Sequence, residues 1–160
     1  MKIEQNASED KLVVTIEGEV DEDAAFESLN FDGIKHVTIN LEKVHSINSC
    51  GIRTWFHWIR EIPADIQISY EKCPQIIVDQ INISKGFLPP RAKVSSFFVP
   101  YHCDECGADH SIVLTRGEDF HEAQDGSEDW IKVEDVQVCP NCGGEMDIDV
   151  INAKYFKFLK

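Results

Sequence analysis

The chain has 160 residues, 42% of them hydrophobic, which is enough for one substantial core and a small second part and excludes a fully disordered chain. Lys and Arg number 15 against 29 Asp and Glu, so the formal net charge is −14. Such a field repels nucleic-acid phosphates and anionic membrane surfaces, and it disfavours both as partners. The sequence contains no apolar stretch of signal-peptide or membrane-spanning length, so we expect a cytoplasmic protein.

The first 99 residues alternate predicted strands with predicted helices. Strands are expected where apolar and polar residues alternate, at 12–18, 37–41, 66–70 and 92–100. An acidic first turn predicts a helix at 21–29, and an apolar stripe predicts one at 49–62. A proline in the first turn predicts a third helix at 74–83. This alternation predicts an α/β fold with a mixed or parallel sheet and helices on one or both faces. The last strand leads directly into the second part, so we expect no flexible linker.

The stretch 36–62 combines a strand, a short turn and the helix with the clearest stripe. Its apolar residues recur every three or four positions and predict one buried face, formed by Ile52, Trp55, Phe56, Ile59 and Ile62. Trp58 and His57 fall beside this stripe, at its edge or on the surface. The turn 46–51 supplies Asn and Ser as cap candidates, so backbone N–H groups lie uncrowded near the surface, where an anion or an acceptor group of a partner could bind.

Four of the six cysteines form two Cys-x-x-Cys pairs, each followed directly by glycine. The ligands predicted from this spacing are Cys103, Cys106, Cys139 and Cys142. Each pair predicts a tight turn that directs two sulfurs at one metal, and two such turns complete a tetrahedral set. Four protein ligands leave no open position, so the expected role is structural. Zinc is the expected metal, and the same four sulfurs also suit iron in an electron carrier.

The second part, residues 100–160, is predicted to be a small β domain of the zinc-ribbon type. Strand-like segments at 111–114 and 146–150 follow the two cysteine pairs, as in two hairpins. Between them, residues 117–129 are acidic with few apolar residues and predict an exposed loop. The segment 151–160 fits a helix better than a strand, and we expect its aromatic face to pack across both parts.

Residues 12–21 and 37–52 resemble the STAS family, the fold of bacterial anti-sigma-factor antagonists and of the cytoplasmic domains of sulfate transporters. The resemblance covers residues 1–99 and implies a four- or five-stranded sheet with flanking helices. The family loop commonly reads Asp-Ser-Ser-Gly-Leu, and a partner kinase that is also an anti-sigma factor phosphorylates its second serine. Here the loop reads Asn48-Ser49-Cys50-Gly51-Ile52. Cys50 stands at the phosphoacceptor position and cannot serve as the usual serine substrate.

The resemblance therefore implies a loop that docks a protein, formed by Asn48, Ser49, Cys50, Gly51 and Arg53. Three functions stay open. The leading expectation is a non-enzymatic signalling protein that binds an anti-sigma-factor-like kinase or another signalling protein, with a structural zinc ribbon. The alternatives are a ribbon-based adaptor of nucleic acid or the transcription machinery, and a small redox protein that uses iron or Cys50. A plain helix cap at this loop and a homo-oligomer also stay open.

Overall fold

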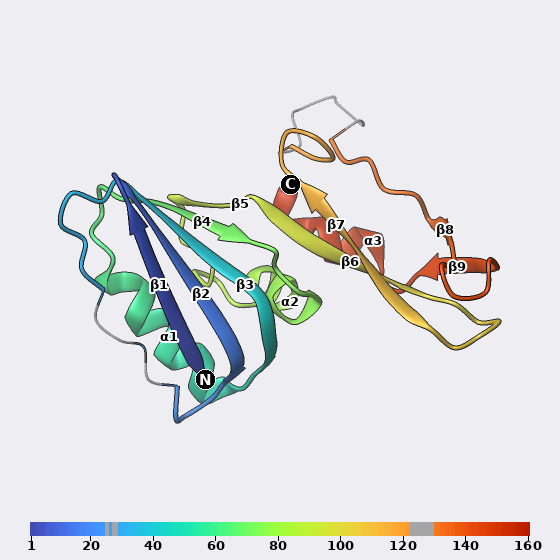
Figure 1. Cartoon of the computed structure of the whole chain (residues 1–160), viewed down its shortest axis with the longest axis horizontal. Helices are drawn as coiled ribbons and strands as arrows, with labels where there is room; N and C mark the ends of the chain where they lie inside the picture. Colours follow the sequence, from blue (N-terminus) through green and yellow to red (C-terminus); the bar gives the residue numbers. More distant parts are fainter. Residues whose placement is uncertain (25, 27–28, 122–129) are drawn as a thin grey trace.

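The computed structural model describes residues 1–24, 26, 29–121 and 130–160, which form two sheets placed end to end (Figure 1). The first sheet has the strand order β1-β2-β3-β4-β5. Its strands are β1 (Lys2–Ser8), β2 (Lys11–Val20), β3 (His36–Ile47), β4 (Gln67–Glu71) and β5 (Ala92–Val94). Only β1 runs antiparallel to its neighbour, and the other three pairs are parallel. The predicted mixed sheet is confirmed.

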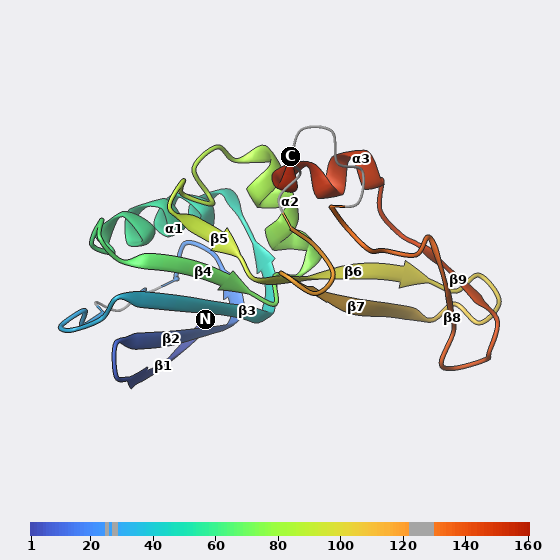
Figure 2. The same cartoon turned by 90° about the horizontal axis from the view of Figure 1, so that it is seen from above.

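Two helices cover one face of this sheet and leave the other face open, as Figure 2 shows for α1 (Ser49–Glu61) and α2 (Gln75–Ile83). The side chains of β2 alternate accordingly, with Leu12 and Val14 buried under the helices and Lys11 exposed on the open face. In the part of the chain that the structure describes, no helix has both the length and the apolar character needed to cross a bilayer.

The helix predicted at 21–29 is wrong for the described residues. Asp21 to Ala24 form a bend and a turn, in which the Asp21 carboxylate accepts the amide N–H of Asp23 at 3.1 Å. Residues 25, 27 and 28 lie outside the described part. The Asp21 side chain bonds within this local turn, and the Glu22 carboxylate accepts a hydrogen bond from the side chain of Asn48 at the start of α1, so these contacts favour a turn over the first turn of a helix.

Helix α1 forms where predicted, but its buried face is centred on two tryptophans. Trp55 and Trp58 are 0% and 3% exposed, whereas Ile52 and Phe56 are only half-buried. The expectation that Trp58 lies at the edge or on the surface is therefore wrong. Phe26, from the connection before β3, stacks on Trp58 with ring centroids 4.7 Å apart. This contact from a distant segment brings Trp58 into the core.

The second sheet is antiparallel, with the strand order β7-β6-β9-β8. Its strands are β6 (Ser96–His102), β7 (Asp109–Thr115), β8 (Val136–Val138) and β9 (Glu145–Ile148). Strands β6 and β7 form one hairpin and β8 and β9 the other, as the ribbon prediction requires. Of the acidic segment 117–129, residues 122–129 lie outside the described part. Within the remainder Phe120 is buried against Phe97, so this portion is not a fully exposed loop.

The single strand predicted at 92–100 is divided at Ser95 between the two sheets. Strand β5 pairs with β4, and β6 begins the second sheet, so the predicted division between residues 99 and 100 falls inside β6. Hydrogen bonds fasten the junction: the amide of Cys73 donates to Ser96 at 3.0 Å, and the amide of Phe98 donates to Cys73 at 2.9 Å. The two sheets share one continuous hydrophobic core.

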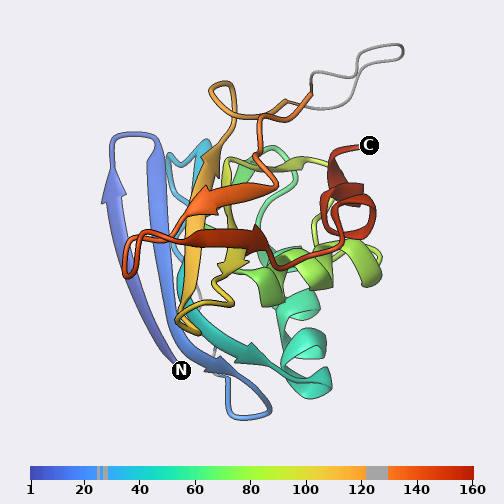
Figure 3. The same ribbon diagram turned by 90° about the vertical axis from the view of Figure 1, so that its right-hand side faces the viewer.

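The C-terminal segment is helical, but it consists of one short α-helix and a 3-10 turn. These are α3 (Asn152–Tyr155) and η1 (Phe156–Leu159), which lie beside α2 (Figure 3). The Tyr155 hydroxyl donates to the carbonyl of Phe98 at 2.5 Å, and the Asn82 side-chain amide donates to the carbonyl of Tyr155 at 2.8 Å. The segment thus contacts both parts, as expected, although Ile151 is 62% exposed and outside the contact.

Candidate functional site

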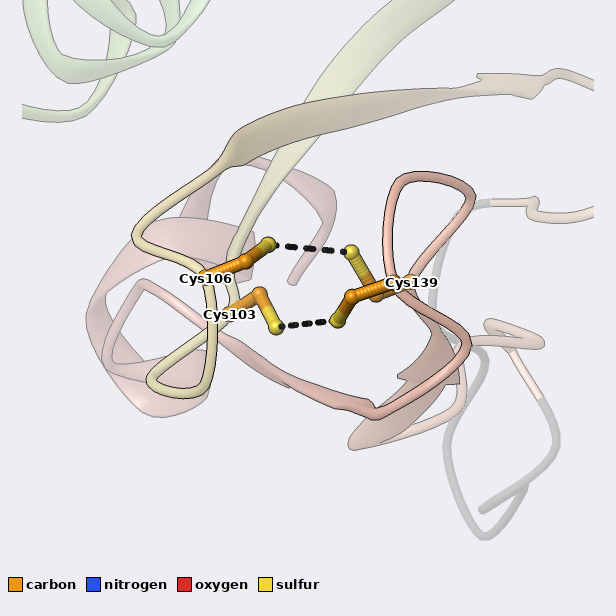
Figure 4. A group of neighbouring side chains, drawn as sticks. Cys103, Cys106 and Cys139 are labelled. Carbon is orange, nitrogen blue, oxygen red and sulfur yellow. Dashed lines mark hydrogen bonds between the residues drawn. The ribbon is translucent and has the colours of Figure 1, made fainter.

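The four predicted cysteine ligands come together at the end of the second sheet that lies farthest from α1 (Figures 1 and 4). Their sulfurs lie within 4.8 Å of one another, and two pairs, Cys103 with Cys142 and Cys106 with Cys139, are separated by 3.6 Å. Zinc–sulfur bonds of about 2.3 Å place tetrahedral sulfurs about 3.8 Å apart, so the cluster fits one ion. All four cysteines are free of disulfides.

The two cysteine turns have the same backbone geometry. In the first, the amide of Cys103 donates to Ala108 at 3.0 Å and the amide of Gly107 donates back to Cys103 at 2.8 Å. In the second, the amides of Cys139 and Gly143 make the corresponding bonds at 2.8 and 2.9 Å. Gly107 and Gly143 have φ angles of 69° and 78°, a conformation that glycine adopts without strain. The glycines following both pairs were a correct sequence signal.

The protonation of the sulfurs is uneven because they crowd one another. At Cys106 the amide of Ala108 favours the thiolate, but desolvation and hydrogen bonding among the sulfurs outweigh it and raise the pKa to about 12. At Cys139 burial disfavours the thiolate, but the amides of Cys142 and Asn141 and the neighbouring thiols stabilise it and lower the pKa to about 6. A bound dication would remove the repulsion among four thiolates, so metal binding must release protons.

The two histidines beside the first cysteine turn do not join the cluster. His102 is partly exposed, and its Nδ1 lies 2.6 Å from the carboxylate of Asp109, which raises the pKa of the imidazole. His110 has a buried Nε2 without a hydrogen-bond partner among the described residues. Four sulfur ligands fill a tetrahedral set, and this donor set supports metal binding without an open position for substrate.

The predicted docking loop begins α1 and is exposed on the surface. Asn48, Ser49 and Cys50 are all exposed, and Asn48 caps the helix by accepting the amide of Gly51 at 2.9 Å. The Asn48 side chain also donates to the Glu22 carboxylate at 2.9 Å, which lowers the pKa of Glu22. Asn48 therefore has the cap role considered from sequence, while Ser49 and Cys50 remain accessible.

Gly51 is the one buried member of this loop. A Cβ built at this position would lie 1.9 Å from the carbonyl oxygen of Val20, at the end of β2. That same oxygen accepts the amide of Asn48 at 3.1 Å. Gly51 is therefore required for close packing of the helix start against the sheet, a reason that the sequence pattern alone did not supply.

The exposed face of α1 carries a row of three basic side chains, of which the sequence analysis identified one. Arg53, His57 and Arg60 are all exposed and follow one another at spacings of four and three residues, which places them on one face. Within the described residues no ion pair is formed by these three. Only Arg53 was predicted as a site residue, although the helical spacing could have identified the whole row.

The two remaining cysteines differ in accessibility. Cys50 is exposed at the helix start. Cys73 is completely buried at the junction of the sheets, and burial raises the pKa of its thiol, which keeps it protonated. Cys73 therefore packs as a small buried hydrophobe.

Comparison with models of known protein families and with curated proteins produced no match.

Proposed function

We propose that this chain is a cytoplasmic, non-enzymatic regulatory protein that binds a partner protein through the start of α1. The docking surface comprises Asn48, Ser49, Cys50, Gly51 and Arg53, as the resemblance to the STAS family implies. The five-stranded sheet with helices beside it is the arrangement expected from that resemblance. The partner would be a signalling protein, such as an anti-sigma-factor-like kinase.

One observation carries the proposal: α1 presents a polar face that the rest of the described chain leaves uncovered. The buried side of the helix is held by Gly51, Trp55 and Trp58, so this surface is rigid before a partner arrives. Rigid surfaces lose little conformational entropy on binding. The arginines Arg53 and Arg60 extend the surface along the helix, and arginine is enriched where protein interfaces concentrate their binding energy.

The four-cysteine cluster has a structural role in this proposal, with zinc as the bound ion. The four sulfurs connect the ends of the two hairpins. Met146 is the one buried residue in the strands of the second hairpin, so metal binding supplies stability that its apolar contacts do not. A reducing cytoplasmic environment keeps the six thiols free for this purpose. The ribbon acts as a stabiliser or as a second docking surface.

The test uses a partner captured with the whole chain, identified by mass spectrometry and then purified. Ser49→Glu and Cys50→Glu should each weaken its binding by about 2 kcal/mol or more, because a carboxylate would be desolvated in the contact. Both substitutions should change the free energy of unfolding by only about 1 kcal/mol, since a negative charge in the first helical turn suits the helix dipole.

Gln75→Glu is the matched control, because Gln75 is the exposed first residue of α2 and the substitution adds the same charge to a first helical turn. It should leave partner binding unchanged. If both loop variants bind the partner as the parent does, the docking site is wrong for this protein. The rate of alkylation of Cys50 tests the alternative that this thiol is a redox sensor. A sensor thiol reacts rapidly at neutral pH, so slow alkylation would argue against that role.

A further inference from the structure

The open face of the first sheet, opposite α1 and α2, contains a groove of 520 Å³. It crosses the start of β2, β3 and β4 and reaches β5 and the end of β7. Strand pairing aligns its side chains in rows: Lys11 lies beside His36, and Thr38, Ser69 and Lys93 follow one another across three strands. Neighbouring strands are about 4.8 Å apart, so side chains in a row can bind one small molecule together.

The charge of this groove is opposite to that of the protein. Its lining includes two lysines, an arginine and a histidine, namely Lys11, Lys93, Arg116 and His36, and no Asp or Glu among the described residues. The whole chain nevertheless carries almost twice as many acidic as basic residues, 29 against 15. A local cationic surface on an acidic protein attracts compact anions, whereas the surrounding field still opposes a long polyanion such as nucleic acid.

Arg116 is held in position at one end of the groove. Its Nε donates to the carbonyl of Val94 at 2.6 Å, and its guanidinium lies 5.1 Å from the ring centroid of Phe120. Its backbone amide donates to the carbonyl of Ser95 at 2.8 Å. A side chain anchored in this way keeps its positive charge at a fixed place in the groove and loses little rotamer entropy when an anion approaches.

The spacing of the cationic groups indicates the shape of the ligand. Three strand intervals and two residues along the strands separate Lys11 from Lys93, a distance of about 16 Å between their backbones. The groove therefore has a cationic group at each end and hydroxyl groups, those of Thr38 and Ser69, between them. No Phe, Tyr or Trp is among the described lining residues, so the small imidazole ring of His36 is the one aromatic surface that these residues offer a nucleobase.

We propose that this groove binds a small hydroxylated organic phosphate with two anionic groups, of the sugar bisphosphate class. One anionic group binds at the end formed by Lys93 and Arg116, and the second binds at Lys11 and His36. The hydroxyl groups of the ligand bond to Thr38 and Ser69. The site lies on the face of the sheet opposite the docking surface on α1, so it does not depend on the proposed function.

The test uses fructose 1,6-bisphosphate as the probe, titrated into the full-length, metal-loaded protein and followed by amide NMR and calorimetry. Binding with a dissociation constant of about 1 mM or tighter is expected, with shifts confined to the starts of β2, β3 and β4, to β5 and to the residues around Arg116. Fructose should not bind, inorganic phosphate should bind more weakly, and added salt should weaken binding of the bisphosphate.

Lys11→Ala combined with Lys93→Ala should lower the affinity for the bisphosphate at least about tenfold, because both anionic groups lose a cationic partner. Lys85→Ala combined with Lys154→Ala removes the same charge from exposed positions elsewhere and should leave the affinity unchanged. The proposal is overturned if the bisphosphate does not bind, if both double variants weaken it equally, or if a 20-residue single-stranded oligonucleotide binds the groove more tightly. Spectra of each variant establish that it is folded.

Discussion

Replacement of Gly51 by alanine tests whether the start of α1 is packed directly against the end of β2. The added Cβ would lie 1.9 Å from the Val20 oxygen and 2.4 Å from its carbonyl carbon, both backbone atoms that cannot rotate away. Reaching a separation of 3.0 Å, below which real Cβ contacts are essentially never found, requires a movement of roughly 1 Å by the helix start. The neighbouring Asn48 amide bond to the same oxygen would then lengthen.

The expected loss combines three terms. Overpacking a well-filled site costs about 1–3 kcal/mol, and a weakened hydrogen bond costs about 1 kcal/mol. Alanine recovers up to about 1 kcal/mol through its higher helix propensity. The net expectation is a decrease of about 2 kcal/mol in the free energy of unfolding, which corresponds to a fall of about 4–8 °C in Tm for a chain of this length.

Urea titration, followed by tryptophan fluorescence and by circular dichroism, measures this loss. Trp55 and Trp58 are on the buried side of the same helix and report on its packing. Cys50→Ala is the control, because it makes a small substitution at the adjacent, exposed position, and we expect a change within about 0.5 kcal/mol. A Gly51→Ala protein as stable as the parent would refute the close contact between α1 and β2.

Two further predictions concern the second sheet and the junction. Chelation, or Cys139→Ser, should raise the rate of amide exchange in β6 to β9 near the cysteine turns while the first sheet stays protected, because a structural zinc site contributes on the order of 10 kcal/mol in small zinc peptides. Acidification should also release the ion, since protons compete with it for the thiolates. Purified protein without stoichiometric zinc or iron would contradict the ribbon. Phe97→Ala should lower the free energy of unfolding by about 3–5 kcal/mol in a denaturation experiment, because Phe97 is completely buried and contacts the aromatic rings of the C-terminal segment. Deletion of 152–160 should remove part of the same contacts and increase motion between the sheets. Unchanged scattering and stability of the deletion variant would argue against that packing.

Local sequence patterns were sufficient for the features that depend on neighbouring residues. Alternating apolar residues predicted the strands, a cap residue and a stripe predicted α1, and the two glycine-terminated Cys-x-x-Cys turns predicted the four sulfurs that come together. These signals succeed because a strand, a helix cap and a chelating turn each obtain most of their geometry within a few residues.

Tertiary structure decided the features that depend on distant segments. Phe26 brings Trp58 into the core, the contact of Glu22 with Asn48 holds a turn where the acidic residues predict a helix start, and competition between two sheets divides one apolar run at Ser95. The cationic groove brings together side chains from residues 11 to 116, and no local period connects them. Burial and register are properties of packed neighbours, so a one-dimensional pattern determines which elements form but not which distant side chains they place together.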